Sequence, residues 1–331
     1  MSLTAGAYAQ DSLVINMYTG VWGTNMKKCI FDTFQETNKV TLQLDQKVSS
    51  VTYTSLRQQK DNPQIDVAWL DGAESDQSWA DSLVDAIDPA KVPNMKHVDK
   101  RALHQTDGKV YAVGTGFYAT GPFQNTKEVK KKITSWFDLW DPALANRVVL
   151  PGTELSNFAP IFMFINKQLG GDSKNFEPAI AKFKELKALS YYPSSGVVAS
   201  SIQSGEALAG AHYPNAIWAL NDQNVPVEPV VPKEGVVAGD IRVHLVKGTK
   251  KKALAEKLID HALKEEVLTC LGENLFIGPP IKNPKLSEKA KQRMPWGATG
   301  SLDNLVMPNW KEVGELKPML IDLWNRRVVQ K

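Results

Sequence analysis

Polar and aromatic side chains recur in this sequence where apolar, strand-like runs come to an end. Aromatic rings can pack on cationic groups, carboxylates accept hydrogen bonds from ammonium groups, and a guanidinium pairs with a carboxylate or a phosphonate. Each residue alone is as well explained by an ordinary strand end or a core position. Their recurrence in both halves of the chain favours a binding cleft for a small molecule. The candidate ligand-binding residues are Tyr18, Trp22, Asp71, Phe117, Tyr118, Glu154, Tyr213, Asn215, Asp240 and Arg242.

Residue patterns for catalysis are absent from the sequence. There is no Gly-x-Ser-x-Gly nucleophile elbow and no phosphate-binding P-loop. The run from Gly114 to Ala119 matches a dinucleotide fingerprint only loosely and opens no helix. We therefore expect no catalytic residue and no cofactor. The alternative from another class is a small transferase or hydrolase that uses Glu154 as a base, for which no second catalytic partner is visible.

Residue types that bind metal ions show no ligand spacing. The five histidines form no zinc-protease pattern, and neither cysteine joins them. Paired phenolates such as Tyr191 and Tyr192 suit ferric iron, but Pro193 and the serines that follow are typical of a helix end. We expect no metal site.

Composition predicts a two-domain protein without a charged partner. The 331 residues favour two domains, and an apolar content of 43% can fill two cores. The 39 basic and 36 acidic residues leave a net charge of +3, and the lysine runs 130–132 and 250–252 have no interleaved aromatic residues. We expect no nucleic-acid partner and a monomer. No stretch approaches the about 20 apolar residues of a membrane span, so we expect a soluble chain without membrane insertion.

The first ten residues, MSLTAGAYAQ, have the features of processing. Ala7-Tyr8-Ala9 before Gln10 is the small-x-small pattern of a signal-peptidase site, and Met1-Ser2-Leu3 resembles an expression scar. We interpret residues 1–10 as a signal-peptide remnant or expression scar and expect export to the periplasm.

The two cysteines, Cys29 and Cys270, are too few for a disulfide scaffold or a structural zinc site. Each is expected on the apolar side of a helix, which favours two buried small hydrophobic side chains. A disulfide is the alternative, because an oxidising periplasm permits one.

Alternating strand and helix patterns must position the candidate residues. Residues 13–17 and 65–70 are typical of buried strands followed by helices, and this alternation predicts a mostly parallel sheet. Ligands bind beyond the carboxyl ends of such strands, which places Tyr18 and Trp22 at a crevice. Segments 110–122 and 236–242 are predicted to cross between two domains. A long amphipathic helix is predicted over 251–271, with Gly272 as its cap.

The order of several motifs resembles a known family. They are TSWFDLWDP at 134–142, GEALAGAHYPNAIW at 205–218, VPKEG at 231–235 and GPP at 278–280. With them, nearly all of the chain after residue 12 resembles an extracellular solute-binding protein of an ABC importer, of the class that includes the spermidine and putrescine receptors.

This resemblance implies a fold, partners and boundaries. The fold is the α/β, two-lobed, type II fold of periplasmic binding proteins, with a hinge of two chain crossings and a cleft that closes over its ligand. Lobe 1 comprises residues 11–115 and 243–290, and lobe 2 comprises residues 116–242 and 291–331. The implied partners are a small-molecule solute and the transmembrane permease of an ABC importer, without a cofactor or catalysis.

The resemblance also implies roles for individual residues. Tyr18 and Trp22 match the aromatic loop that packs on an aliphatic or cationic ligand, and Asp71 falls near a small polar contact. Glu154 lies where polyamine receptors place carboxylates that accept ammonium groups. Tyr213 takes the position of an aromatic wall, and it stands alone where the iron-binding relatives carry paired tyrosines.

One departure from the family concerns the charge of the solute. After VPKEG the polyamine receptors present an aromatic residue and then an aspartate, whereas this chain has Gly239, Asp240, Ile241 and Arg242. Asp240 can substitute only with a shift of one residue. Arg242 would bind a carboxylate or phosphonate if it faces the cleft, or else it points to solvent or pairs with Asp240. The sequence favours a polyamine-like or other amino-bearing solute and leaves an acidic solute as the alternative.

Overall fold

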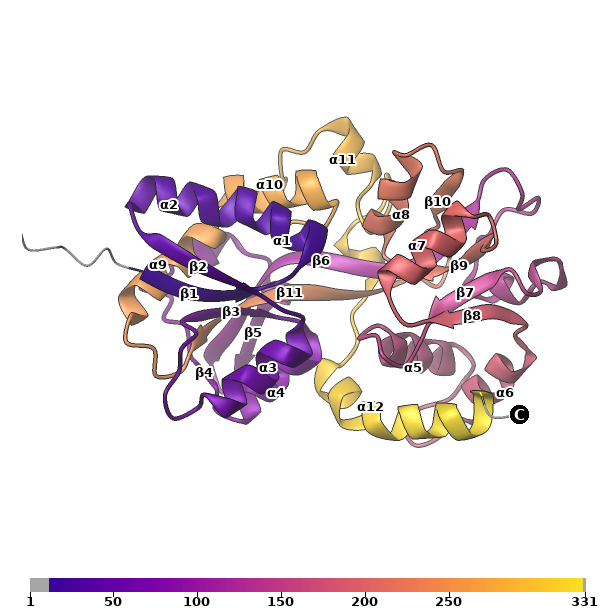
Figure 1. Ribbon diagram of the computed structural model, residues 1–331, viewed down its shortest axis with the longest axis horizontal. Coiled ribbons are helices and arrows are strands. Elements are labelled where there is room, and N and C mark those ends of the chain that lie inside the picture. Colours follow the sequence, from indigo (N-terminus) through magenta and orange to yellow (C-terminus); the bar gives the residue numbers. More distant parts are fainter. Residues whose placement is uncertain (1–11, 330–331) are drawn as a thin grey trace, which may run out of the picture. The chain divides into compact units, whose positions relative to one another are not determined.

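The computed structural model describes residues 12–329 as two compact units (Figure 1). Unit 1 comprises the described residues 12–116, 240–275 and 279–285, and unit 2 comprises 117–239, 276–278 and 286–329. The chain passes between them within two long strands, at Gly116–Phe117 and at Gly239–Asp240, and three more times after residue 275. The interpretation of residues 1–10 as a processing remnant lies outside the described residues.

The unit boundaries differ from the predicted lobes at four places, and the first is Gly116, which belongs to unit 1. Residues 240–242 belong to unit 1, whereas 276–278 and 286–290 belong to unit 2. The reason is side-chain chemistry, because Arg242 forms ion pairs within unit 1 and the guanidinium of Arg293 lies over the ring of Phe276 within unit 2.

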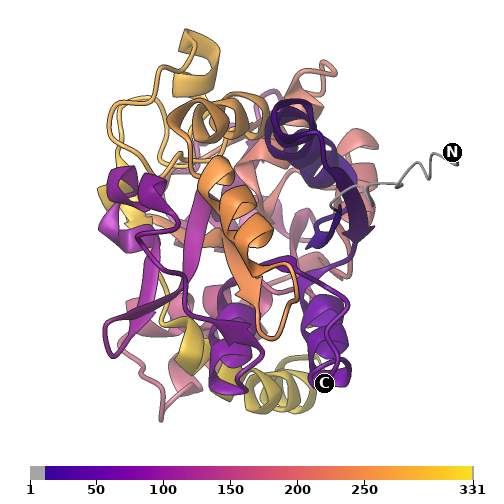
Figure 2. The same cartoon turned by 90° about the vertical axis from the view of Figure 1, so that its left-hand side faces the viewer.

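Unit 1 is a sheet with helices on both faces (Figure 2). Its strand order is β2-β1-β3-β11-β6, with β1 parallel to β2 and β3, and β11 antiparallel to β3. The predicted parallel sheet is therefore a parallel core with antiparallel additions. Its elements are β1 Ser12–Met17, α1 Gly20–Met26, a π-helical segment Lys27–Phe31, α2 Asp32–Asn38, β2 Thr41–Gln46, α3 Ser49–Gln58, β3 Val67–Leu70, α4 Gly72–Ala80, β4 Val84–Asp85, short 3-10 turns Pro93–His97 and Lys100–Ala102, β5 Leu103–Thr106, the first part of β6 Lys109–Asn125, most of β11 Val236–Val246, α9 Lys252–Ala262 and α10 Glu265–Leu275.

Strand β3, at the centre of the sheet of unit 1, is apolar on both faces, as expected for a sheet covered by helices on both sides. On β3, the Trp69 ring meets the ring of Phe31 edge-on at 5.4 Å, on the side of the α1–α2 helical stretch. The alternate residues Ala68 and Leu70 pack instead with Leu56 of α3. The period of two along the strand thus sends successive side chains to different helices.

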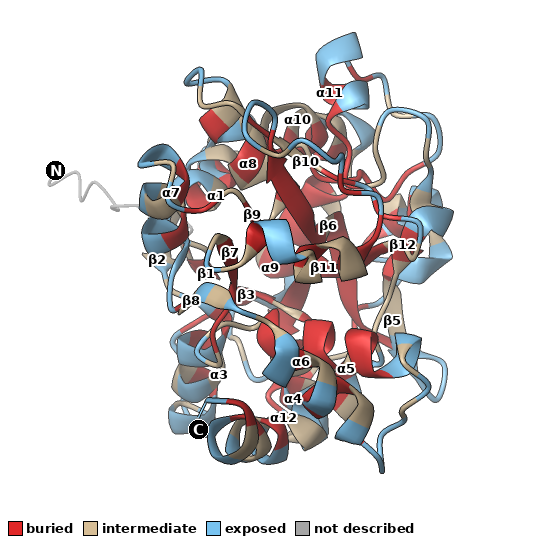
Figure 3. Ribbon diagram, turned by 90° about the vertical axis from the view of Figure 1, so that its right-hand side faces the viewer, coloured by how far each residue is buried: buried red, intermediate tan, exposed pale blue. Residues whose placement is uncertain are grey.

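Unit 2 repeats this architecture. Its strand order is β6-β9-β7-β8, with β7 parallel to β8 and β9, while β6 is antiparallel to β9. Strands β7 and β9 are buried throughout, and Figure 3 shows exposed residues on the outer faces of its helices. Its elements are the second part of β6, short 3-10 turns Trp136–Trp140, Pro142–Leu144 and Leu302–Asn304, β7 Val148–Pro151, α5 Phe158–Gln168, α6 Glu177–Glu185, β8 Ala188–Tyr192, α7 Ser195–Gln203, β9 Ala209–His212, α8 Pro214–Asn221, β10 Val227–Pro229, the start of β11, α11 Glu288–Gln292, β12 Leu305–Val306, α12 Trp310–Trp324 and a π-helical segment Asn325–Val329.

Two predicted elements differ from the structure. The predicted helix over 251–271 is two helices, α9 and α10, which are separated at Leu263 and Lys264. The second helix begins with Glu265 and Glu266, whose carboxylates favour a helix N-terminus. Gly272 lies inside α10 and is buried, so its predicted role as a cap is wrong.

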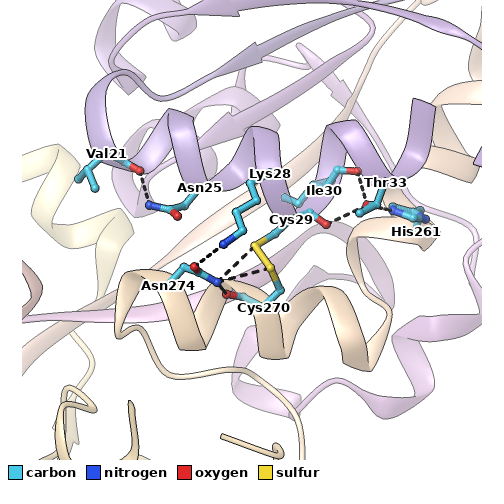
Figure 4. The surroundings of a disulfide bond; sticks show 9 residues. All are labelled: Val21, Asn25, Lys28, Cys29, Ile30, Thr33, His261, Cys270 and Asn274. Atoms are coloured by element: carbon cyan, nitrogen blue, oxygen red, sulfur yellow. Dashed lines mark hydrogen bonds between the residues drawn. A yellow bond between two sulfur atoms is a disulfide. The ribbon is translucent and has the colours of Figure 1, made fainter. Parts of the chain in front are cut away.

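Cys29 and Cys270 form a disulfide, so the favoured prediction of two separate buried cysteines is wrong (Figure 4). Their Cα atoms are 5.7 Å apart across 241 residues of sequence. The bond joins the π-helical segment to α10, and Lys28 supports it by donating a hydrogen bond to Asn274 of α10 at 2.8 Å. The spacing of two cysteines in the sequence does not show whether folding brings their helices together.

We expect Cys29→Ser with Cys270→Ser to lower the free energy of unfolding by about 2–5 kcal/mol, because the bond closes a long loop in the unfolded chain. Urea denaturation of the oxidised protein and of the double variant measures this difference. The matched control is dithiothreitol, which should destabilise the wild type and leave the double variant unchanged. Equal free energies of unfolding for the wild type and the double variant, both measured without dithiothreitol, would contradict the prediction.

Candidate functional site

Unit 1 brings three predicted residues together at the carboxyl ends of two neighbouring strands. Tyr18 follows β1 and Asp71 follows β3, and the two strands are parallel neighbours. The Tyr18 hydroxyl donates a hydrogen bond to Asp71 Oδ1 at 2.8 Å. Trp22, on the first turn of α1, meets the Tyr18 ring edge-on at a centroid distance of 6.3 Å. Parallel pairing therefore assembles an aromatic pair around a carboxylate, as the sequence predicts for ligands of α/β sheets.

The carboxylate of Asp71 is not used to cap its own helix. Asp71 occupies the N-cap position of α4, yet within the described chain its side chain makes no capping hydrogen bond. Its backbone N–H donates to Ser49 Oγ at 3.0 Å. Burial, followed by the nearby Glu74 carboxylate, raises the pKa of Asp71 to about 6, against the opposing effects of Tyr18 and Ser49. A carboxylate with a raised pKa at a strand end is typical of a functional site.

Arg242 does not face a ligand. Its side chain is 2% exposed and forms ion pairs with Asp76 at 2.6 Å and with Asp240 at 2.9 Å. Its Nη1 also donates to the backbone oxygen of Gly72 and to Ser75 Oγ. The prediction that Arg242 binds a carboxylate or phosphonate is therefore wrong, and the alternative pairing with Asp240 is correct, because the guanidinium is buried and its Nε and Nη1 donate within unit 1.

Asp240 belongs to the same buried group and is also unavailable. Its second oxygen lies 2.5 Å from His104 Nε2, and the carboxylate is fully buried. Burial alone would raise the pKa of Asp240, but the charges of Arg242 and His104 hold it at about 2. The predicted role of Asp240 as a solute contact is corrected to that of a buried counter-ion. We call Arg242, Asp76, Asp240 and His104 the charge cluster.

Two predicted aromatic residues of unit 2 meet, and a third is buried in the core. The ring of Tyr118 on β6 is edge-on to that of Tyr213, which precedes α8, at 6.0 Å. Phe117 is 1% exposed, and its backbone forms reciprocal hydrogen bonds with Gly278. Its predicted role in the site is therefore corrected to a core position. Asn215 is half-buried in the first turn of α8.

Glu154 is exposed in the turn that follows β7. Its carboxylate lies over Gly152, where an added Cβ would come within 2.4 Å of Oε2. The glycine therefore keeps room for this carboxylate at the carboxyl end of a strand, where a solute ammonium group could reach it.

Four further polar residues gather at the same edge of unit 2, and the sequence reasoning predicted none of them as a contact for an organic solute. The hydroxyl of Tyr192 donates to the Ala211 carbonyl at 2.7 Å, so the 3.0 Å contact with His212 Nδ1 must be donated by the histidine. This tautomer leaves His212 Nε2 as an acceptor, and burial lowers the pKa of His212 to about 4. Asn157 donates to Thr120 Oγ1 at 3.4 Å.

The carbonyl oxygen of the Asn157 side chain, Oδ1, is buried without a hydrogen-bond partner in the described part of the chain. A buried acceptor without a donor is costly unless a ligand or water supplies one. One signal in the sequence pointed to it: Asn157 lies three residues after Glu154 in the loop before the apolar helix α5.

Tyr191 and Tyr192 do not form a paired phenolate site. They end strand β8, where the period of two sends Tyr191 against the Trp324 ring and Tyr192 against His212. Burial raises the pKa of Tyr191 to about 12 and that of Tyr192 well above its ordinary value. The predicted helix end at this position is wrong. Among residues 12–329 no cluster of three or more histidine, cysteine, aspartate or glutamate side chains is arranged to hold a metal ion, and no helix is long and apolar enough to cross a membrane.

Comparison with known protein families gives a match over most of the chain. A family model described as "Bacterial extracellular solute-binding protein" matches residues 30–295. A spermidine/putrescine-binding periplasmic protein of Haemophilus influenzae is 26% identical over 289 residues, which cover 85% of this chain and 78% of the relative. A spermidine/putrescine-binding periplasmic protein of Salmonella typhimurium is 24% identical over 288 residues, or 84% of this chain and 80% of the relative.

Solved structures share the fold, which is the two-lobed α/β fold of type II periplasmic binding proteins. An ABC transporter structure from Clostridium perfringens aligns with a TM-score of 0.80 at 24% identity, covering 96% of this chain and 99% of that one. A GABA receptor aligns at 0.80 with 17% identity, covering 97% and 98%. The periplasmic binding protein AfuA from Actinobacillus pleuropneumoniae, with fructose-6-phosphate bound, aligns at 0.75 with 21% identity, covering 98% and 100%.

We expect Asp71→Asn to stabilise the protein more at pH 7.5 than at pH 4.5. The pKa of Asp71 is higher in the folded protein than the about 3.9 of an unfolded chain, so its contribution to stability is present below pH 4 and lost as the pH rises through about 6. The variant should gain up to about 2 kcal/mol relative to the wild type between the two pH values, as measured by urea denaturation. Asp61→Asn, at an exposed carboxylate of the same unit, gives the baseline for the loss of one charge. An equal difference from the wild type at both pH values would contradict the assignment.

We expect Gly114→Ala to lower the free energy of unfolding by about 1–3 kcal/mol through overpacking. A Cβ at this position would lie 2.5 Å from Asp240 Oδ2 and 2.9 Å from the Ala102 side chain, so it would displace the charge cluster. Gly196→Ala is the matched control, because only Ser194 Oγ at 3.9 Å lies near its added methyl group in helix α7. Thermal unfolding of the two variants compares them, and equal midpoints would contradict the prediction.

Proposed function

Because the chain belongs to the family of bacterial extracellular solute-binding proteins, we propose that it is a periplasmic receptor for a small organic solute that carries an amino group. The receptor delivers this solute to the transmembrane permease of an ABC importer. One observation carries the choice of solute: the carboxylates of Asp71 and Glu154 lie at strand ends of the two units, and the candidate guanidinium for an acidic solute is neutralised in buried ion pairs.

The acceptors are distributed over both units. Asp71 in unit 1 and Glu154 in unit 2 are carboxylates that can accept charge-assisted hydrogen bonds from ammonium groups. Asn157 Oδ1 in unit 2 is a buried acceptor without a partner among the described residues, and the tautomer of His212 makes its Nε2 an acceptor as well. An anionic group bound at these positions would instead lie against carboxylates and lone pairs, which would repel it.

Aromatic rings supply the remaining part of the proposed site. Tyr18 and Trp22 present ring faces and edges beside Asp71, and Tyr213 does so in unit 2. Rings of this kind favour a cation or the methylene groups between two amines. A transport receptor requires that its solute bind one conformation of the chain more tightly than another.

Relatives and neighbours support an amino-bearing solute without identifying it. The Haemophilus influenzae relative is named for spermidine and putrescine, and one structural neighbour is a GABA receptor. The neighbour AfuA holds fructose-6-phosphate, which carries a phosphate group. An acidic solute is therefore the alternative outcome of the test, together with an enzyme that turns the solute over.

A thermal-shift panel tests the solute class. Putrescine and spermidine should raise the unfolding midpoint of the wild type, whereas glucose 6-phosphate and succinate should not. Stabilisation by the acids alone would overturn the proposal in favour of an acidic solute. Conversion of a stabilising solute, followed by mass spectrometry over hours, would overturn it in favour of an enzyme.

Site variants test the residues. We expect Glu154→Gln to weaken putrescine binding by about 10- to 100-fold, because it removes one charge-assisted hydrogen bond. Trp22→Ala should weaken putrescine binding by about tenfold or more, because the contact with the ring is lost. The control is Glu206→Gln, at an exposed carboxylate before β9, which should bind as the wild type does in calorimetry. Unchanged affinity in both Glu154→Gln and Trp22→Ala would remove the proposed site.

A further inference from the structure

The first turn of helix α4 is held from the side by a residue of another element. An aspartate at the N-cap position ordinarily accepts hydrogen bonds from the first N–H groups of its helix. Asp71 makes no such bond among the described residues, and its Oδ1 accepts from Tyr18 instead. The beginning of α4 is held by the backbone hydrogen bond from Ser75 N–H to the Asp71 carbonyl at 2.8 Å, and by side-chain contacts from outside the helix.

Arg242 supplies such side-chain contacts. Its Nη1 lies 3.3 Å from the carbonyl oxygen of Gly72, 3.2 Å from Ser75 Oγ and 2.6 Å from Asp76 Oδ1. These three groups span the first turn of α4, immediately after Asp71. Its Nε donates to Asp240 at 2.9 Å, which fixes the guanidinium at the point where β11 enters unit 1.

Ser75 is held by a second residue besides Arg242, namely His244. His244 Nδ1 donates to the Ala68 carbonyl, so its Nε2 accepts the Ser75 hydroxyl proton at 2.9 Å. The Ser75 oxygen then accepts from Arg242 Nη1. Burial and the nearby guanidinium lower the pKa of His244 to about 3, which keeps this arrangement intact at neutral pH.

We propose that Arg242 is a positioning residue for solute binding: by anchoring the first turn of α4, it fixes the position of the Asp71 carboxylate, which directly precedes that turn, for contact with the solute. The inference rests on the proposed function, because Asp71 is the group through which Arg242 acts. It reverses the role that the sequence suggested for this arginine, which contacts helix α4 and no solute.

The electrostatics act in the same direction as the geometry. The positive charge of Arg242 favours the ionised form of Asp71, against the burial and the Glu74 carboxylate that disfavour it. Asp76 and Asp240 neutralise the guanidinium, so it can be buried without attracting an anionic solute. The charge cluster thus supports a carboxylate at the strand end without becoming part of the site.

A double-mutant cycle with putrescine as the probe tests the proposal. Arg242→Lys keeps the charge but cannot make the forked contacts. We expect it to weaken putrescine binding by about tenfold, because Asp71 would no longer be held in position to contact the solute. In the Asp71→Asn background the same change should weaken binding by less than about twofold. In the Glu154→Gln background, the matched control in unit 2, it should keep its full effect. Thermal unfolding first establishes that each variant is folded at the assay temperature.

The outcomes separate the inference from the proposed function. An equal loss from Arg242→Lys in the wild-type and Asp71→Asn backgrounds would overturn the inference alone, because Arg242 would then act on the whole unit. Unchanged binding in Arg242→Lys would also overturn it. If Asp71→Asn and Glu154→Gln both bind putrescine as the wild type does, or putrescine does not bind the wild type, then the proposed solute site itself fails.

Hydrogen exchange tests the anchor without any solute. In Arg242→Lys, the amides of the first turn of α4 should exchange about tenfold faster than in the wild type, or more, since local opening becomes easier. If Arg242→Lys does not fold, Ser75→Ala should show the same increase. The amides of α10 in the same unit should keep their rates. Unchanged exchange in α4 for both variants would overturn the role of Arg242 as its anchor.

Discussion

The pairing of one buried guanidinium with two carboxylates governs much of unit 1. Arg242 and Asp240 are both removed from water, and such charges are tolerated in a protein interior only when each is paired and hydrogen-bonded. The pairing joins β11 to the first turn of α4, and His104 extends it to β5. It also decides the polarity of the candidate site, because it withdraws the arginine from the strand ends and leaves carboxylate and lone-pair acceptors there.

Parallel strands explain why those acceptors gather in two places. In each unit a core of parallel strands ends at one edge, and the residue after each strand reaches that edge whatever its distance along the chain. Tyr18 and Asp71 meet in this way across 53 residues, and His212 meets Tyr192 across 20. Only the first turn of each helix that follows a strand lies at this edge, so a few residues are enough to form a site there.

Covalent and polar ties hold the helices that support this edge. The disulfide between Cys29 and Cys270 fastens the helical stretch after Trp22 to α10, and Arg242 fastens α4. In both cases the supporting contact lies behind the candidate site rather than in it. This separation allows the exposed side chains to vary while stability comes from the buried layer beneath them.

The sequence by itself determined the α/β class, the membership of a solute-binding family and the strand-end residues, because apolar periodicity and local motifs are properties of neighbouring residues. It predicted Tyr18, Trp22 and Asp71 as candidate ligand contacts for this reason. Only the tertiary structure decided which polar residues are already engaged. The burial of Arg242, the joining of Cys29 to Cys270 and the partnerless oxygen of Asn157 depend on contacts between distant segments, and the side-chain type does not reveal whether folding supplies a partner.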